Sequence, residues 1–171
     1  LDPVFLRLMD ETKALLRSVF HTQNPLTLPI SGTGSAGMET CLGNLIEPGV
    51  EIVVGIIGAF GLRMADMVER YGSKLVSMDI PWGHVFTPDH VQDALTRCRH
   101  PKLVALVHAE TSTGAWQPLE EMAAVVHQAG ALLLVDAVTS LGGCPLDVDV
   151  WGIDLCYSGT QKCLSCPPGL A

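Results

Sequence analysis

The sequence predicts an α/β fold of three layers, in which a mostly parallel sheet is covered by helices on both faces. Short aliphatic runs alternate with segments of helical periodicity along the chain, which is typical of parallel strands joined by right-handed crossovers. The apolar share is 48% and only 16% of the residues are charged, as expected for strands buried on both faces. The 171 residues contain neither an internal repeat nor a low-complexity linker, so we expect one domain over residues 1–171.

Helices and strands are predicted to alternate from the start of the chain. Asp2 can cap a first helix, Pro3 is tolerated in its first turn, and an apolar stripe runs along it. Further on, β-branched residues mark a buried strand, and Gly72 ends the helix that follows it. The expected elements are a helix over residues 1–20, a strand over 26–30 weakened by Pro29, a helix over 36–46, a strand over 51–56, a helix over 60–71 and a strand over 74–78.

The second half continues the same alternation. Thr87 and Pro88 open a helix with inward-facing apolar residues, and Gly130 closes the next helix. The expected elements are the helix that begins at residue 87, a strand over 103–107, a helix over 119–129, a strand over 131–135 and a short strand over 153–157. This order predicts that ligands bind at the carboxyl ends of the strands, where Gly34, Gly58, Phe60, Thr111 and Asp136 can converge.

Composition narrows the choice of partners. The formal net charge of −8 argues against nucleic acid or an anionic membrane surface. No apolar run reaches membrane-spanning length, and no basic segment leads into an apolar one at the start, so we expect no membrane span and no signal peptide. We therefore expect neither nucleic acid nor a membrane among the partners.

The six cysteines do not suggest a disulfide scaffold in a chain that can form a large core. Cys41 and Cys98 fall in helical patterns and are expected to be buried as small apolar side chains. Cys163 and Cys166 have the spacing of a redox or metal pair, but no second pair of ligands stands near them. We therefore predict no metal site and a reducing compartment.

Lys162 is the most conspicuous candidate for chemistry. It follows a short apolar strand and small hydroxyl residues, and a Pro-Pro-Gly turn comes soon after it. A lysine in such a place can be held in a cavity, where its amine becomes a nucleophile or carries a carbonyl cofactor. Taken alone, the position is also compatible with an ordinary exposed lysine.

Two other stretches supply what pyridoxal 5′-phosphate (PLP) would need. Residues 31–39 form a Gly-rich turn before a helix, and Thr33, Gly34 and Ser35 suit a phosphate held by backbone N–H groups. Asp136 ends a run of aliphatic residues, and a buried carboxylate needs a cation or a strong donor. The pyridine nitrogen of PLP is such a partner. Asp136 can instead cap the turn over residues 137–141.

A dinucleotide site is the competing interpretation of the Gly-rich turn. Residues 32–37 satisfy the G-x-G-x-x-G pattern. Such a site also requires an acidic residue at the end of the second strand to hold the ribose, and that strand ends in residues 55–58 without one, with Glu51 at the opposite end. The NAD-binding alternative is therefore disfavoured, while a turn that merely uses glycines stays open.

Four motifs in order resemble the class V PLP-dependent aminotransferases of the alanine–glyoxylate and serine–glyoxylate type. They are residues 32–39, 108–114, 136–143 and 158–162, so the likeness covers nearly the whole chain. The resemblance implies the large, cofactor-binding domain of a fold-type I PLP enzyme. In that family a small C-terminal domain follows, and we expect this chain to be a fragment that lacks it and is inactive alone.

The resemblance also implies roles for individual residues. Thr111 would approach the phenolic oxygen of the cofactor, and Gln161 would lie near its phosphate. Phe60 stands where the family places a stacking aromatic residue, often tryptophan, although helical spacing explains it equally well as a core residue. Lys162 would bond to the cofactor and then move the substrate proton. His108, at a strand end, is interpreted as a structural histidine and not as a general base.

The implied function is transfer of an amino group from alanine or serine to glyoxylate or a similar 2-oxo acid, by a homodimer. A lyase, a desulfurase or a phosphonate aminotransferase of the same class would share these landmarks, and a non-catalytic α/β interaction domain is a further alternative. The arginine that binds the substrate carboxylate is expected beyond this chain. Peroxisome, mitochondrion and cytoplasm stay equally open as locations.

Overall fold

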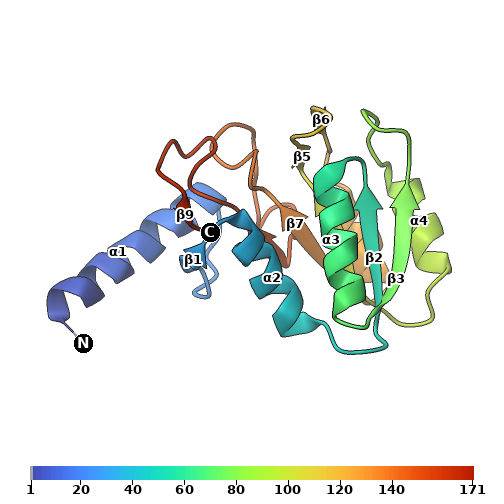
Figure 1. The fold of residues 1–171 in the computed structure, drawn as a ribbon, viewed down its shortest axis with the longest axis horizontal. Helices are drawn as coiled ribbons and strands as arrows, with labels where there is room; N and C mark the ends of the chain where they lie inside the picture. Colours follow the sequence, from blue (N-terminus) through green and yellow to red (C-terminus); the bar gives the residue numbers. More distant parts are fainter. Residues whose placement is uncertain (1) are drawn as a thin grey trace.

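Five parallel strands form the central sheet of the protein (Figure 1). The computed structural model describes residues 2–171. In sheet order the strands are β3 (Lys74–Asp79), β2 (Glu51–Ile56), β4 (Pro101–Val107), β7 (Leu132–Asp136) and β8 (Leu155–Tyr157). Each strand predicted between residues 51 and 157 is present, with ends shifted by a few residues, and the predicted parallel α/β class is confirmed.

Helices cover both faces of this sheet and create two separate cores. Alternate side chains of a strand point to opposite faces, and β4 shows this division: Leu103 and Ala105 belong to one core, Val104 and Leu106 to the other. The first core includes side chains of α2 (Gly34–Leu45) and α3 (Ala59–Arg70), and the second includes side chains of α4 (Pro88–Thr96) and α5 (Met122–Gln128). The predicted three-layer arrangement is therefore confirmed.

The register of the sheet aligns the carboxyl ends of three neighbouring strands. Val107 of β4 pairs with Asp136 of β7, which pairs with Tyr157 of β8. The loops that leave these strands therefore begin at one edge of the sheet, as the strand-end rule for ligand sites requires.

Two short antiparallel pairs lie outside the main sheet. β1 (Ser31–Gly32) pairs with β9 (Gly169–Leu170), and β5 (Ala109–Glu110) pairs with β6 (Ala115–Trp116). Backbone bonds of 2.8 and 2.9 Å between Ile30 and Ala171 extend the first pair. This pairing brings the Gly-rich turn beside the segment that follows Lys162, although well over a hundred residues separate them in the sequence.

The predicted strand over residues 26–30 is wrong. Residues 22–30 have no regular secondary structure, and strand pairing begins only at Ser31. Pro25 and Pro29 have no N–H group to donate to a neighbouring strand. Local hydrogen bonds form instead of a strand ladder: Leu26 N–H donates to the side chain of Asn24, and the Thr27 hydroxyl donates to the backbone carbonyl of Asn24. The predicted helix over 119–129 is also shorter: residues 120–121 form a turn before α5, and α5 ends at Gln128.

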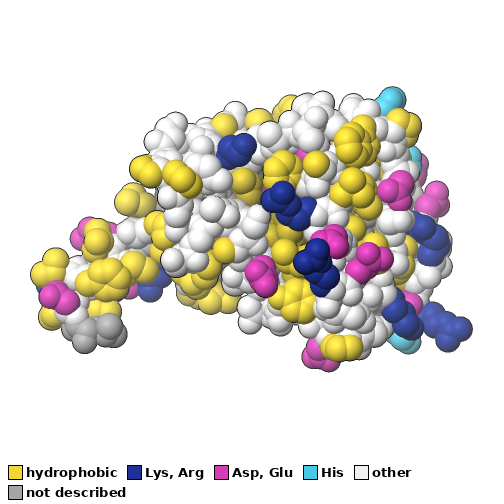
Figure 2. Space-filling model, viewed as in Figure 1, with side chains coloured by type: hydrophobic (Ala, Val, Ile, Leu, Met, Phe, Trp, Pro, Cys, Tyr) yellow, Lys and Arg dark blue, Asp and Glu magenta, His cyan; other side chains and the backbone are white. Residues whose placement is uncertain are grey.

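The first helix, α1 (Pro3–Phe20), projects from the sheet and its helices (Figure 1). Asp2 caps it as predicted, with its carboxylate accepting the N–H groups of Val4 and Phe5; Leu1 lies outside the described residues. None of the residues of α1 is buried, and Phe5 and Leu15 are 53% and 68% exposed. Figure 2 shows apolar side chains along this projecting helix.

Within residues 2–171, no helix has the length and apolar character to cross a membrane.

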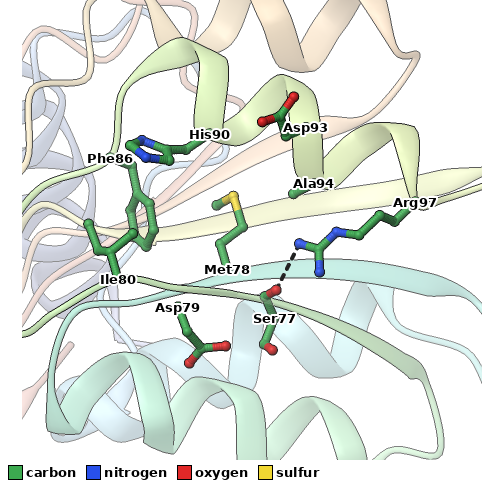
Figure 3. A pocket seen from close by; sticks show the side chains of 9 residues that line it. All are labelled: Ser77, Met78, Asp79, Ile80, Phe86, His90, Asp93, Ala94 and Arg97. Atoms are coloured by element: carbon green, nitrogen blue, oxygen red, sulfur yellow. Dashed lines mark hydrogen bonds between the residues drawn. The ribbon is translucent and has the colours of Figure 1, made fainter.

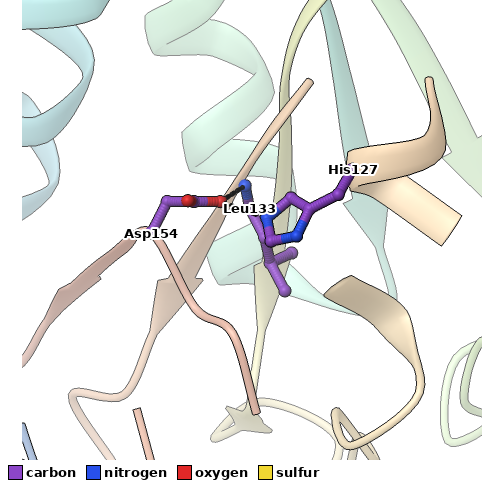
Figure 4. A network of polar contacts seen from close by, with 3 residues as sticks. All are labelled: His127, Leu133 and Asp154. Carbon is purple, nitrogen blue, oxygen red and sulfur yellow. Dashed lines mark hydrogen bonds and ion pairs between the residues drawn. The ribbon is translucent and has the colours of Figure 1, made fainter. Parts of the chain in front are cut away.

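A polar contact joins α5 to the sheet at the edge opposite the predicted site (Figure 4). The carboxylate of Asp154, just before β8, lies 2.8 Å from His127 Nε2 and accepts the N–H of Leu133 at 2.8 Å. One carboxylate thus ties the end of a helix to two parallel strands. It lies at the amino ends of β7 and β8, opposite the ends at which Asp136 and Tyr157 stand.

Candidate active site

Asp136 is a buried carboxylate at the end of β7, only 4% exposed. Its Oδ1 accepts the N–H of Val138 at 2.9 Å, and its Oδ2 accepts the hydroxyl of Tyr157 at 2.6 Å. Among residues 2–171, no lysine or arginine forms an ion pair with it. Burial raises its pKa to about 6, and the two hydrogen bonds act in the opposite direction. A cationic donor such as a protonated ring nitrogen would complete this environment.

The capping interpretation of Asp136 accounts for part of this geometry. The bond from Val138 N–H is the bond that a carboxylate at the start of a turn would accept. The bond from Tyr157 comes from the neighbouring strand and has no place in a turn cap. The carboxylate is therefore held by two elements, and it is more firmly oriented than a cap requires.

The burial of Asp136 predicts how the stability of the cofactor-free protein depends on pH. Because the raised pKa means that the folded state binds this proton more tightly, the contribution is fully present below pH 3.8 and is lost as the pH rises through about 6. A rise from 3.8 to about 6 corresponds to about 3 kcal/mol of unfolding free energy lost by pH 7. Urea unfolding of cofactor-free wild type and Asp136→Asn, from pH 4 to 8, checks this. Parallel pH profiles in the two proteins would contradict it.

The Gly-rich turn packs directly against the segment that follows Asp136. A Cβ on Gly34, the first residue of α2, would lie 2.6 Å from a methyl group of Val138, so a larger residue there would have to displace Val138 or the helix. Gly159, in the loop before Lys162, lies on the same helix end, because a Cβ on it would be 3.4 Å from the Gly34 nitrogen. The first N–H groups of a helix have no carbonyl within the helix to bond to. The amides of Gly34 and Ser35 are thus placed to bind an anion between the two loops.

Phe60 and Arg63, from the first turns of α3, reach towards this helix end. The guanidinium of Arg63 lies 5.2 Å from the ring centroid of Phe60, and its Nη1 donates to the Ser35 hydroxyl at 3.2 Å. Phe60 is half-buried and also packs on the core beneath α3. The sequence analysis missed Arg63, because the periodicity of a helix does not show which distant loop an exposed arginine contacts.

Glu110 is a second buried carboxylate, 1% exposed, and it also escaped the sequence analysis. Its Oε2 accepts the N–H groups of Phe60 and Gly61 at 3.1 and 3.2 Å, and its Oε1 accepts the N–H and hydroxyl of Ser112. Gly58, which precedes α3, has no side chain with which to cap that helix. The one signal in the sequence was a helix start at Gly58 without a capping side chain, and it does not show which distant residue supplies the cap. Glu110 supplies the missing cap and fixes the backbone of Phe60.

We expect Glu110→Gln to destabilise the protein. Glutamine keeps the size but loses the charge at the amino end of α3 and one of the two acceptor oxygens. Loss of bonds to a buried charged acceptor should lower the unfolding free energy by about 2 kcal/mol. Urea unfolding of the cofactor-free protein measures this change. Glu121→Gln, at an exposed position before α5, is the control and should change stability by less than about 0.5 kcal/mol.

The loop that carries Lys162 is attached to the loop after β7. Cys163 Sγ lies 3.3 Å from the carbonyl oxygen of Thr139, and the Thr139 hydroxyl lies 2.6 Å from that of Thr111. Lys162 itself is half-buried, and Gln161 is exposed. These contacts connect Lys162 and Thr111 to the segment that begins at Asp136. The sequence-predicted residues therefore lie on loops at the carboxyl edge of the sheet, and these loops contact one another.

His108 has the structural role that the sequence predicted. It is buried, its Nδ1 lies 2.9 Å from the Ser140 hydroxyl, and its Nε2 lies 2.9 Å from the indole Nε1 of Trp116. Because an indole N–H only donates, Nε2 accepts and Nδ1 carries the proton. Burial lowers the pKa of His108 to about 4. Both nitrogens are engaged, so this histidine stays neutral and orients the loop after β4.

A cavity of about 420 Å³ lies elsewhere, between β3 and α4 (Figure 3). Met78 and Phe86 line it on the apolar side, and Arg97 donates from its rim to the carbonyl of Ser77 at 2.8 Å. It contains none of the sequence-predicted site residues.

The prediction for two of the cysteines needs a correction. Cys41 and Cys98 are half-buried, not fully buried, and burial raises the pKa of Cys41 to about 11.

Comparison with known proteins identifies the family of this chain. The profile of the family "Aminotransferase class-V" matches residues 4–171. The chain is 45% identical over 165 residues to alanine–glyoxylate aminotransferase of Rattus norvegicus, covering 96% of this chain and 40% of that protein. It is 42% identical over 170 residues to (S)-ureidoglycine–glyoxylate transaminase of Bacillus subtilis, covering 99% of this chain and 41% of that protein.

A solved structure shows the same fold. The crystal structure of alanine–glyoxylate aminotransferase from Nostoc sp. superposes with a TM-score of 0.96 at 51% identity, over 99% of this chain and 45% of that one. The chain thus spans less than half the length of these relatives. The fold expected from the resemblance is confirmed, and with nearly every residue inside the family profile, the chain belongs to the class V aminotransferase family.

Proposed function

We propose that residues 1–171 form the cofactor-binding large domain of a longer PLP-dependent aminotransferase that uses glyoxylate as amino acceptor. The observation that carries this proposal is the contact of the loop after Asp136 with both the amino end of α2 and the Lys162 loop. The two relatives named above differ in the amino donor of their names but share glyoxylate. The acceptor is therefore the better supported half of the reaction.

The polar groups on these loops fit PLP. The amides of Gly34 and Ser35 would bind its phosphate with the Ser35 hydroxyl, which Arg63 already orients. Asp136, buried and without an ion pair among the described residues, would accept a hydrogen bond from the protonated ring nitrogen. Phe60 would cover a ring face, Thr111 would approach the phenolic oxygen, and Gln161 would lie near the phosphate. When bound, PLP supplies an electron sink that makes the substrate Cα–H acidic.

Lys162 is the residue to which we assign the chemistry. Its primary amine can hold the cofactor covalently and, once released by an incoming amino donor, can accept and return the proton at the substrate Cα. Its half-buried position, in a loop bonded to the loop after β7, limits where the amine can move. Glu110 and His108 keep the strand-end loops around it in place and take no part in proton transfer.

We also propose that the longer chain is a homodimer with small-molecule substrates: alanine, serine or ureidoglycine as donor and a 2-oxo acid as acceptor. The resemblance supports the dimer, and the exposed apolar side of α1 agrees with further packing against protein. Light scattering of the full-length protein should give twice the mass of one chain. A monomer at micromolar concentration would contradict this part of the proposal.

The test of the function is a spectrum followed by a donor screen. Full-length protein purified with PLP should be yellow, and it should lose that band when an amino donor is added and regain it with glyoxylate. Alanine, serine and ureidoglycine are tried as donors, each against glyoxylate and pyruvate. Colourless protein that binds NAD instead would favour the dinucleotide alternative, and protein that binds neither would favour an interaction domain.

A further inference from the structure

Tyr157 is a buried phenol that contacts the carboxylate of Asp136 from the neighbouring strand. The two residues are register partners in the parallel pair of β7 and β8, so their side chains project on the same face of the sheet. Both are 4% exposed, and the hydroxyl of Tyr157 donates to Asp136 Oδ2 at 2.6 Å. The sequence analysis did not single out this tyrosine.

The tyrosine ring is wedged between α2 and the sheet. A Cβ on Gly37 of α2 would lie 3.1 Å from Tyr157 Cβ and 3.2 Å from its Cδ2, so the helix rests directly on this side chain. The ring also belongs to the core formed by Met38, Leu42 and their neighbours. Tight packing on both sides limits the rotation of the ring. The hydroxyl is consequently held at Asp136 in a stable hydrogen bond.

The two donors divide the carboxylate of Asp136 between them. Val138 N–H occupies Oδ1 and the Tyr157 hydroxyl occupies Oδ2. An ionised carboxylate has about four acceptor sites, so room remains for a ring N–H. Donors of this kind stabilise the charged form of a carboxylate. Without the phenol, a proton shared between Asp136 and a ring nitrogen would move towards Asp136.

We propose that Tyr157 is a positioning residue of the active site, whose hydroxyl orients Asp136 and keeps it ionised so that the ring nitrogen of a bound cofactor retains its proton. The part that concerns the cofactor rests on the proposed function. Other groups around Asp136 act as a fixed background: the charge of Glu110 raises its pKa and that of Arg63 lowers it. The thiols of Cys41 and Cys156 stay protonated, since burial raises the pKa of both.

The first arm of the test uses the cofactor-free full-length protein. The carboxyl carbon of Asp136, labelled with carbon-13, reports its own titration by NMR. Tyr157→Phe keeps the ring and removes the hydroxyl, and it should raise the midpoint by about one pH unit, the change expected for one lost bond to a charged group. Tyr71→Phe, which alters a tyrosine that packs on α2 at Gly43, is the matched control and should leave the midpoint unchanged.

The second arm separates a chemical role from a packing role. 3-Fluorotyrosine placed at position 157 by amber suppression is a more acidic phenol of nearly the same size. It donates a stronger bond and should lower the midpoint of Asp136, opposite to the effect of phenylalanine. An unchanged midpoint in this variant overturns the proposal even if Tyr157→Phe fails to fold.

The third arm uses protein loaded with PLP whose ring nitrogen is nitrogen-15. Wild type should show a protonated ring nitrogen at neutral pH, and Tyr157→Phe should shift the resonance towards the neutral position and slow the reaction with amino donor about tenfold or more. A protonated nitrogen in both proteins overturns the proposal. If no PLP binds to wild type while the Asp136 midpoint still shifts in the first arm, the proposed function fails and the coupling of Tyr157 to Asp136 stands.

Discussion

Replacing Lys162 by alanine in the full-length protein should abolish the visible absorbance of bound PLP and nearly all aminotransferase activity. The amine of Lys162 is the group to which we assign both the covalent bond and the movement of the Cα proton. Proton transfer by a placed side chain contributes about 10²–10⁴-fold, so turnover should fall at least that far. PLP itself should still bind through the amides at the amino end of α2, because Lys162 takes no part in that cradle.

The measurement combines steady-state assays with reductive trapping. Sodium borohydride should fix PLP on the wild type through Lys162 and leave none on the alanine variant, as read by mass spectrometry. Lys102→Ala, at an exposed position in β4, is the control and should behave as the wild type. Trapped PLP on the Lys162→Ala protein, with activity retained, would mean that another lysine carries the cofactor.

The second large effect is expected for Asp136→Asn. Asparagine keeps the shape and can still accept the N–H of Val138, so a pure turn cap would lose about 1 kcal/mol or less. If the charge of Asp136 keeps the ring nitrogen protonated, the neutral amide of asparagine can no longer do so. The ring then withdraws electrons less strongly from the substrate Cα. The reaction with amino donor should slow by about a hundredfold or more, the scale of losing one preorganised charge.

Rapid mixing of the PLP-loaded variant with amino donor measures this rate directly by absorbance. Asp79→Asn provides the control, since Asp79 is an exposed carboxylate at the end of β3, on the same edge of the sheet. Equal rates in wild type and Asp136→Asn would return Asp136 to the role of a turn cap. A slower rate could also arise because the variant binds less PLP. Titrating each protein with PLP before mixing separates this cause from a loss of electron withdrawal by the ring.

The alternation of helices and strands was readable from the sequence because it is local. A buried strand such as β2 needs consecutive β-branched residues, and α3 needs apolar residues at helical spacing, wherever these elements lie in the fold. The positions of Lys162 and Asp136 near one edge of the sheet were readable for a related reason. Each stands where an apolar run ends, and parallel strands bring such ends to one edge of the sheet.

Only the tertiary structure decided which distant groups meet. The pairing of β1 with β9, the cap that Glu110 gives to α3, and the bond from Tyr157 to Asp136 each join segments whose neighbourhood depends on strand order and register. Periodicity contains no information on order or register. The same limit applies to α1, whose apolar stripe was correctly predicted but is exposed in the described structure. The sequence determined the elements and their chemistry, while long-range packing determined the partners of each buried polar group, because such a group must find a hydrogen bond wherever the fold places it.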